Sequence, residues 1–234
     1  MTPQLHGRMT TADGVVLVHG GMHTSQCWDP LLPFLRCPVR AVDLPGRRAR
    51  PADLASVTLA DCVTAVIEDA DAAGFDRFIL VGHSLGGVTI SEVAVRHPER
   101  VAHLVYVGAL VPSPGTSAAV LMTGSDIVEM PMPAEDNARA AFGNDLSQGE
   151  WDRHRMVLVP DAVGILNARL SGYPSGIPIT YVNMSRDKPV PPDLADQMVA
   201  NLGPGDARHT IEAGHSVMVS QPAALAEVIN ALTN

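Results

Sequence analysis

The sequence predicts an α/β protein, with a mostly or wholly parallel sheet of about six strands and helices on both faces. Six short apolar runs are spaced along the chain, and segments of helical period lie between most of them. Most of these runs are continuously apolar, as expected of parallel strands that are covered on both sides. The 234 residues suffice for one such domain with a substantial core and are marginal for two.

The predicted strands, in chain order, are VVLVH (15–19), VRAVDL (39–44), RFILVG (77–82), HLVYVG (103–108), PITYVN (178–183) and RHTIE (208–212). A helix is predicted over 58–74, where Thr58 is a candidate N-cap and Gly74 follows the last turn. The last helix is predicted to open at Pro222, with an apolar face made of Leu225, Val228, Ile229 and Leu232. Strands that alternate with helices in this way indicate a doubly wound sheet.

Residues 112–176 break this alternation. The segment is rich in Pro, Gly, Met and Ser, and its helical fragments are PAEDNARAAF and SQGEWDRHRMVL. It is too long for a structureless loop inside a compact domain. We therefore predict an inserted lid or cap over the carboxyl ends of the strands, where open α/β sheets bind ligands, and a core made of 1–111 and 177–234. A disordered linker is the alternative, but the fragments carry apolar anchors that linkers usually lack.

Composition and charge exclude several classes of function. The net charge of −9 argues against a nucleic-acid or anionic-membrane partner. The N-terminus lacks the layout of a signal peptide, and no apolar run approaches the ~18 residues of a membrane span. Cys27, Cys37 and Cys62 are odd in number and lack metal-ligand spacing, so we expect reduced thiols and a cytoplasmic location. Because dinucleotide and P-loop glycine patterns are also missing, no cofactor is expected.

The stretch VGHSLGG (81–87) places Ser84 between Gly82 and Gly86, after a predicted strand and before a predicted helix. This is the context of a nucleophile elbow, in which small neighbours let the strand and the helix approach each other. The start of the helix then favours negative charge near Ser84. A plain strand-to-turn transition is the alternative. We interpret Ser84 as a candidate nucleophile.

A serine nucleophile requires a base, and the base requires an acceptor. His215 lies in EAGHSVM, a turn between the last predicted strand and the last helix. Asp187 follows the strand PITYVN, which gives the chain order serine, acid, histidine. Other carboxylates near this end of the chain are Asp193, Asp196 and Asp206. The first two read as first-turn helix residues, so Asp187 is the predicted acid.

The oxyanion of an acyl transfer needs two backbone N–H donors. Leu85, directly after the nucleophile, should supply one of them. The loop after the first strand begins HGG (19–21), and Gly21 should supply the other because the backbone must approach the substrate there.

The sequence resembles the α/β-hydrolases in the stretches VLVHGGMHTSQCWDPLLPFL, AVDLPGR, VGHSLGG, SRDK and AGHSVM. The closest branch is that of small serine esterases grouped with plant methyl esterases and hydroxynitrile lyases. The resemblance covers nearly the whole chain apart from the predicted lid. It implies the fold, with Ser84 as nucleophile, His215 as base, Asp187 as acid, and an oxyanion hole at Gly21 and Leu85.

The sequence thus predicts a cofactor-free serine hydrolase that cleaves an ester or thioester of a small, largely apolar substrate. Met22 and Trp151 are predicted substrate contacts, together with Met122, Met130 and Met132, although ordinary core packing would explain them equally well. The alternatives are a lyase using the same three residues, a pathway-specific thioesterase or cyclase, and a non-catalytic ligand-binding homologue. The sequence leaves open whether the chain is a monomer or a homodimer.

One resemblance-based distinction concerns the lyases. In the related lyases, threonine commonly follows the first-loop histidine, and lysine follows the catalytic histidine. Here these positions are Gly20 and Ser216, and the only lysine, Lys188, lies beside the predicted acid. A lyase needs a nearby positive charge for the departing cyanide, so this arrangement favours hydrolysis.

Overall fold

The structure is a computed structural model that describes residues 12–125, 129, 131–173, 175–203 and 207–233. Its described part contains one parallel sheet with the strand order β2-β1-β3-β4-β5-β6. The strands are β1 (Gly14–Val18), β2 (Val39–Val42), β3 (Phe78–His83), β4 (Val101–Val107), β5 (Ile179–Met184) and β6 (Ala207–Ile211). Each overlaps one predicted strand, so the predicted fold class is confirmed.

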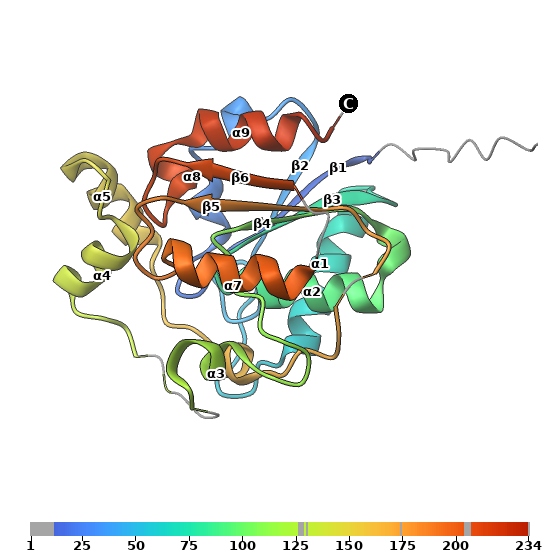
Figure 1. Cartoon of the computed structure of the whole chain (residues 1–234), viewed down its shortest axis with the longest axis horizontal. Coiled ribbons are helices and arrows are strands. Elements are labelled where there is room, and N and C mark those ends of the chain that lie inside the picture. The colour runs from blue at the N-terminus through green and yellow to red at the C-terminus, as the bar shows by residue number, and fades with distance from the viewer. Residues whose placement is uncertain (1–11, 126–128, 130, 174, 204–206, 234) are drawn as a thin grey trace, which may run out of the picture.

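The central strands of the sheet are buried on both faces, which explains the continuous apolar runs. Along β1, Val16 and Val18 belong to one core cluster, whereas Val15 and Leu17 belong to the other. Side chains alternate between the faces of a strand, so covering both faces requires apolar residues at every position. Figure 1 shows the sheet nearly edge-on between two layers of helices.

The helices of the first layer are α1 (Leu59–Ala72), α2 (Gly86–Arg96) and α7 (Pro192–Leu202). The second layer holds the short η1 (Ser25–Trp28) and η2 (Leu32–Phe34) with α8 (Val217–Ser220) and α9 (Pro222–Asn230). η3 (Pro98–Arg100) connects α2 to β4. The predicted cap of α1 is present, because the Thr58 side chain accepts from the Asp61 N–H and the Asp61 carboxylate accepts from the Thr58 N–H.

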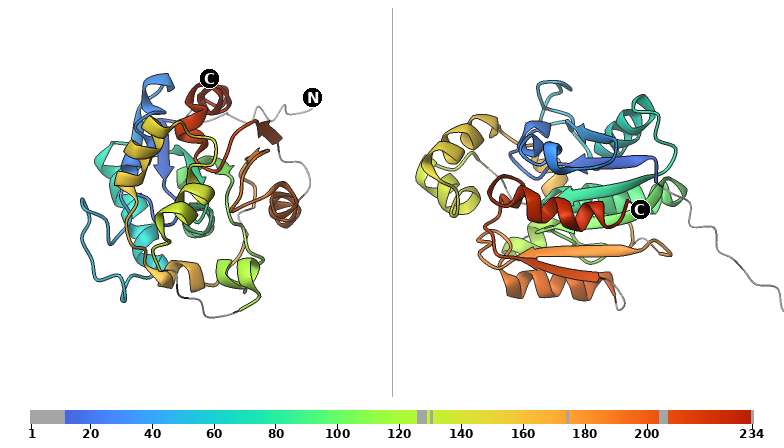
Figure 2. Two further views of the ribbon diagram at one scale, coloured as in Figure 1. Left: turned by 90° about the vertical axis from the view of Figure 1, so that its left-hand side faces the viewer. Right: turned by 90° about the horizontal axis from the view of Figure 1, so that it is seen from above.

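The segment 112–176 connects β4 to β5. It contains α3 (Ala118–Thr123), α4 (Glu135–Phe142), α5 (Gln148–His154), η4 (Arg155–Val157) and α6 (Val163–Asn167). Figures 1 and 2 show α4 and α5 beyond the edge of the sheet where the strands end, while α3 and α6 lie below the first layer. The fragments predicted as helical became α4 and α5; α3 and α6 had no clear sequence signal.

All loops that follow strands open at the edge where α4 and α5 lie, because every strand pair is parallel. The loops after β1, β3, β5 and β6 carry the candidate residues of the sequence analysis. Among the helices of the described ranges, none is both long and apolar enough to cross a membrane.

Candidate active site

Ser84 lies on a strained turn between β3 and α2. Its φ is +51°, a region that residues other than glycine rarely occupy. The Ser84 N–H donates to the Val107 carbonyl oxygen over 3.1 Å, and the Ser84 carbonyl oxygen accepts from the Leu110 N–H over 2.9 Å. These bonds to β4 and the loop after it hold the turn in place, and strain maintained in this way is typical of functional positions.

The glycines around Ser84 have steric causes. A Cβ atom at Gly86 would lie 2.7 Å from the His19 carbonyl oxygen, and one at Gly82 would lie 2.8 Å from Ile90 Cδ1. A Cβ atom at Gly20, in the loop after β1, would lie 2.8 Å from Cβ of Ser84. Any side chain at these positions would push α2 or the first loop away from the serine. The spacing of the motif therefore follows from close packing around Ser84.

Asp187 and His215 form a buried pair. Nδ1 of His215 lies 2.9 Å from Oδ1 and 2.8 Å from Oδ2 of Asp187, and both side chains are fully buried. The carboxylate also accepts from the Val190 N–H over 2.8 Å. Because a carboxylate only accepts, Nδ1 carries the hydrogen of the neutral ring and Nε2 keeps a lone pair. Within the described part of the chain, Nε2 of His215 has no hydrogen-bond partner.

The loop after β1 is held by His19. Nδ1 of His19 donates to the Gly20 carbonyl oxygen over 2.8 Å, and its Nε2 accepts from the Leu44 N–H over 3.2 Å. Burial, aided by the Arg47 charge, lowers the pKa of His19 to about 4, so the ring is neutral at pH 7. The Gly20 carbonyl and the Gly21 N–H belong to one trans peptide and point in opposite directions. His19 therefore fixes the direction of the Gly21 N–H.

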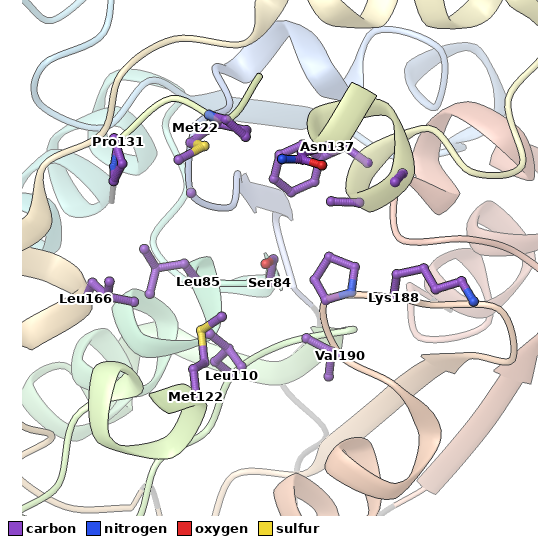
Figure 3. Close-up of a pocket in the computed structure, with 16 residues that line it drawn as sticks. Met22, Ser84, Leu85, Leu110, Met122, Pro131, Asn137, Leu166, Lys188 and Val190 are labelled. Carbon is purple, nitrogen blue, oxygen red and sulfur yellow. The ribbon is translucent and has the colours of Figure 1, made fainter. Parts of the chain in front are cut away.

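A cavity of about 600 Å³ opens over Ser84. Figure 3 shows Ser84 near its centre, with the polar atom of Lys188 directed away from the serine. The lining is mostly apolar and comes from the first loop, the serine turn, the segment 112–176 and the loop after Asp187. The residues are Gly21, Met22, Ser84, Leu85, Leu110, Met122, Pro131, Pro133, Asn137, Ala140, Ala141, Phe142, Leu166, Lys188, Pro189 and Val190.

Only some of the predicted substrate contacts line the cavity. Met22 and Met122 line the cavity, whereas Trp151 does not. Trp151 is 1% exposed and forms a small core of its own with Ala138 and Leu146. A large aromatic residue that ties two short helices together needs this burial, so we correct its predicted role to packing. Met132 is exposed and is not part of the lining, and Met130 lies outside the described residues.

The other carboxylates lie elsewhere. Asp193 is an exposed residue in the first turn of α7, and Asp196 forms an ion pair with Arg208 over 2.6 Å. Asp206 lies outside the described residues. Asp187 is thus the carboxylate that the structure brings to His215.

Buried histidines that were not predicted as site residues lie beside His215 and Asp187. Nδ1 of His23 donates to the Gly21 carbonyl oxygen over 2.7 Å, and its Nε2 lies 3.2 Å from Nε2 of His154 on α5. The same His154 nitrogen lies 3.0 Å from Oγ of Ser216, whose hydroxyl donates to the Phe142 carbonyl oxygen over 2.6 Å. One N–H of His154 therefore serves both His23 and Ser216. The chain of bonds joins the first loop, α4, α5 and the residue after His215.

These histidines are neutral at pH 7. Burial, with repulsion from His154, lowers the pKa of His23 well below its ordinary value, and burial with repulsion from His215 does the same for His83. Burial lowers the pKa of His154 to about 4, again with repulsion from His215. His83 directly precedes Ser84 in its motif and His23 follows the HGG loop, so both had a positional signal, whereas nothing around His154 in the sequence points to the site.

The turn between α4 and α5 is hydrogen-bonded to the two loops that carry Asp187 and His215. The Asp145 carboxylate accepts from the Gly214 N–H over 2.6 Å, and the Asn144 side chain donates to the Arg186 carbonyl oxygen over 2.9 Å. Gly214 and Arg186 directly precede His215 and Asp187 in sequence. A Cβ atom at Gly214 would lie 2.2 Å from Oδ1 of Asn144, so only glycine admits this contact. No group of three or more His, Cys, Asp or Glu side chains in the described part could hold a metal ion.

A scan against protein-family models matches residues 15–228 to the alpha/beta hydrolase family. The chain belongs to this family. Among curated relatives of this alpha/beta hydrolase, the pyrethroid hydrolase of Sphingobium wenxiniae is 27% identical over 94% of the chain and 87% of the relative. Methyl jasmonate esterase 1 of Vitis vinifera is 36% identical, but the match covers 42% of the chain and 40% of that protein.

Solved structures agree on the fold. An extracellular alpha/beta-hydrolase from a Paenibacillus species superposes with a TM-score of 0.79 at 22% identity, covering 92% of this hydrolase and 97% of the other chain. Polyneuridine aldehyde esterase also gives 0.79 at 22% identity, covering 95% and 99% of the two chains. The resemblance stated from the sequence is thereby confirmed.

Proposed function

We propose that this protein is a serine hydrolase that cleaves a carboxylic ester of a small, largely apolar substrate through an acyl-enzyme on Ser84. The observation that carries this proposal is the buried pair of His215 and Asp187. It leaves Nε2 of His215 with a lone pair. The His215 carbonyl oxygen lies 3.0 Å from Nε2 of His83, the residue that precedes the half-buried Ser84 on its strained turn. The names of the relatives, a pyrethroid hydrolase and a methyl jasmonate esterase, support an ester as the bond that is cleaved.

In acylation, Nε2 of His215 takes the proton of the Ser84 hydroxyl while Oγ attacks the ester carbonyl carbon. The imidazolium that forms is stabilised by the Asp187 carboxylate. The tetrahedral intermediate then collapses, the bond to the alcohol oxygen breaks, and His215 returns the proton to the leaving alcohol. An acyl group remains on Oγ.

The negative oxygen of the intermediate accepts from the N–H groups of Gly21 and Leu85 in this mechanism. Both residues line the cavity. His19 orients the Gly21 N–H in advance, and α2 begins at Gly86, so its N-terminus favours negative charge beside Leu85. Each such donor contributes about 3 kcal/mol to transition-state stabilisation.

Deacylation repeats these steps with water as the nucleophile. His215 takes a proton from water as the oxygen attacks the acyl carbon, and it then protonates Oγ of Ser84 when the acid is released. All proton transfers use groups of the chain itself, so the proposed cycle includes no cofactor.

The cavity supports an apolar substrate. Its volume of about 600 Å³ lies within the usual range for small-molecule sites, and its lining includes Met22, Leu110 and Met122. Methionine adapts to irregular shapes, which suits esters with bulky apolar groups. We propose that the segment 112–176 acts as the lid over this cavity and selects among such substrates.

We also propose a cytoplasmic location with a small molecule as the partner. Cys27 and Cys62 are buried, free thiols, and burial raises the pKa of Cys62 to about 12 and that of Cys27 well above its ordinary value. Thiols held neutral in this way suit a reducing compartment.

The proposal is tested by labelling the protein with a fluorophosphonate probe and assaying a panel of 4-nitrophenyl and methyl esters. We expect wild type to be labelled, and Ser84→Ala to lose both labelling and ester hydrolysis while keeping its fold. Ser91→Ala, which alters a serine on α2 that does not line the cavity, should remain labelled. A folded wild type that stays unlabelled and inert would contradict the proposal and favour a ligand-binding homologue.

The same assay separates hydrolysis from C–C lysis. Ser216 is hydrogen-bonded to His154 and to the Phe142 carbonyl oxygen, so no ammonium group follows His215. Lys188 lines the cavity, but its ammonium group is directed away from Ser84. We expect no cyanide release from cyanohydrins above the buffer rate. Cyanide release that depends on Ser84, with all esters inert, would assign the protein to the lyases.

A further inference from the structure

Met22, the residue after the proposed oxyanion donor Gly21, has a strained backbone. Its φ is +60°, and it is one of two non-glycine residues with positive φ in the described ranges, the other being Ser84. A bulky residue is rarely found in this region unless its surroundings impose it. The two strained residues line the cavity from the loops after the neighbouring strands β1 and β3, and the strain at Met22 requires a cause.

The cause is a set of bonds from the chain segment 159–161, which returns from the proposed lid to the core. The Met22 N–H donates to Oδ2 of Asp161 over 2.7 Å, and the Met22 carbonyl oxygen accepts from the Val159 N–H over 2.9 Å. Both backbone groups of Met22 are thus held by residues about 140 positions away in sequence. A local turn also contributes, since the His23 N–H donates to the Gly20 carbonyl oxygen over 3.4 Å, and the two long-range bonds hold this turn in place.

Arg47 completes this arrangement from the loop after β2. Its Nη2 donates to Oδ1 of Asp161 over 2.6 Å, and its Nε donates to the His23 carbonyl oxygen over 2.6 Å. The side chains of both partners are 1% exposed. Asp161 therefore holds the peptide before Met22, Arg47 holds the peptide after His23, and the ion pair between them is buried.

We propose that the buried Arg47–Asp161 pair positions the oxyanion hole through Met22, and that the arm of the lid thereby contributes to transition-state stabilisation without touching the substrate. The inference rests on the proposed function, since Gly21 is its proposed oxyanion donor. The peptide between Gly21 and Met22 directly follows the peptide that carries the Gly21 N–H. A rotation at Met22 therefore turns the backbone next to the donor. A donor displaced by about 1 Å can cost up to about 100-fold in rate.

The pair is a better candidate for positioning than for stability alone. A buried ion pair often adds little to stability relative to apolar residues of the same size. Here each charge also binds backbone of the first loop, and Asp161 accepts from the Ala162 N–H over 2.8 Å as well. Three donors converge on one carboxylate, and an amide in its place could accept on one side only.

The test uses Asp161→Asn, Arg47→Lys and the double variant Arg47→Gln/Asp161→Asn in the full-length protein. Two reactions are measured per folded active site. Hydrolysis of 4-nitrophenyl butyrate gives kcat and KM, and fluorophosphonate labelling gives a second-order rate constant. The affinity for phenylboronic acid, whose adduct on Ser84 is tetrahedral, is measured in parallel.

Asp161→Asn should lower kcat and the labelling rate by about 10- to 100-fold, weaken phenylboronic acid by a similar factor, and leave KM within about threefold. Arg47→Lys keeps the charge but lacks Nε, so a smaller loss of the same kind is expected. The double variant should lose no more than Asp161→Asn, because the two residues act as a unit. If Asp161→Asn does not fold, the other two variants carry the same measurements.

Glu92→Gln is the matched control. Glu92 is a buried carboxylate on α2 that accepts from the Ser171 hydroxyl over 2.9 Å, so it also binds a distant part of the segment 112–176. Its substitution should leave kcat, labelling and boronate affinity within about threefold of wild type.

The inference is overturned if folded Asp161→Asn and Arg47→Lys retain wild-type kcat and boronate affinity, or if Glu92→Gln loses as much as they do. Failure of the proposed function has a different signature: wild type itself is unlabelled, or hydrolysis survives in Ser84→Ala. That result would overturn both proposals.

Discussion

His215 can act on Ser84 only if one hydrogen is on the correct ring nitrogen. Asp187 accepts from Nδ1, which leaves the lone pair on Nε2. The Val190 N–H binds the same carboxylate and keeps it in position, and Gly108 leaves room for it, since a Cβ atom there would lie 2.9 Å from Oδ2 of Asp187. The proposed base is thus defined by its neighbours rather than by its own position in the sequence.

We expect Asp187→Asn to lower kcat by about 10³- to 10⁴-fold, because the amide can donate to Nδ1 and so place the hydrogen on Nε2. Steady-state kinetics of ester hydrolysis, with the fold checked by circular dichroism, measure this loss. Asp193→Asn, at an exposed position of α7, should stay within a few-fold of wild type. Equal losses in the two variants would mean that Asp187 is not the acid.

At the scale of elements, α4 and α5 are both short helices, and the turn that connects them is bound to the core. Their connecting turn binds the loops of Asp187 and His215 through Asn144 and Asp145, and His154 links α5 to the first loop. The core beneath them is small, with Trp151 as its largest member. Short helices that bury little apolar surface open more readily than the strands of a sheet.

Hydrogen exchange should therefore be faster in the described parts of 112–176 than in β1, β3 and β4. Phosphonylation of Ser84 should slow it, since a bound group contacts the cavity side of α4, where Ala140, Ala141 and Phe142 are found. Mass spectrometry of peptic peptides, with and without the probe, measures both effects. Uniform protection along the chain would argue against a lid that opens.

At the scale of the whole molecule, the carboxyl edge of the sheet gathers buried histidines that are neutral in the folded state. Burial lowers the pKa of His19 and His154 to about 4, and those of His23 and His83 well below their ordinary value. Unfolding exposes these rings to water, where their pKa is about 6.5. Between these values the unfolded chain binds protons that the folded chain excludes.

The free energy of unfolding should therefore fall as the pH is lowered from about 7 towards about 4, by up to about 1.4 kcal/mol per pH unit for each such histidine. Urea unfolding at a series of pH values measures this slope. His154→Gln should lower the number of protons taken up on unfolding by about one and so reduce this slope. If His154→Gln leaves the pH dependence of the unfolding free energy unchanged, His154 is protonated equally well in the folded and the unfolded chain.

Local pattern determined most of the fold. Short runs predicted all six strands of the described sheet, and most of these runs are continuously apolar because parallel strands with both faces covered need apolar residues at every position. The turn at Ser84 was predicted because its glycines are neighbours in sequence and their steric reason is local. The chain order of Ser84, Asp187 and His215 predicted which loops would carry them, and parallel strands bring such loops to one edge.

Only the tertiary structure decided which distant segments contact those loops. His154 and Asp161 come from a segment without a recognisable pattern, and they reach the first loop across more than a hundred residues of chain. The same holds for Trp151, which packs between short helices instead of lining the cavity. Sequence periodicity reports which side of an element is buried, but not which distant element covers it. The contacts that shape the first loop and hold α4 and α5 depend on which distant elements meet. They join surfaces that become neighbours only when the chain has folded.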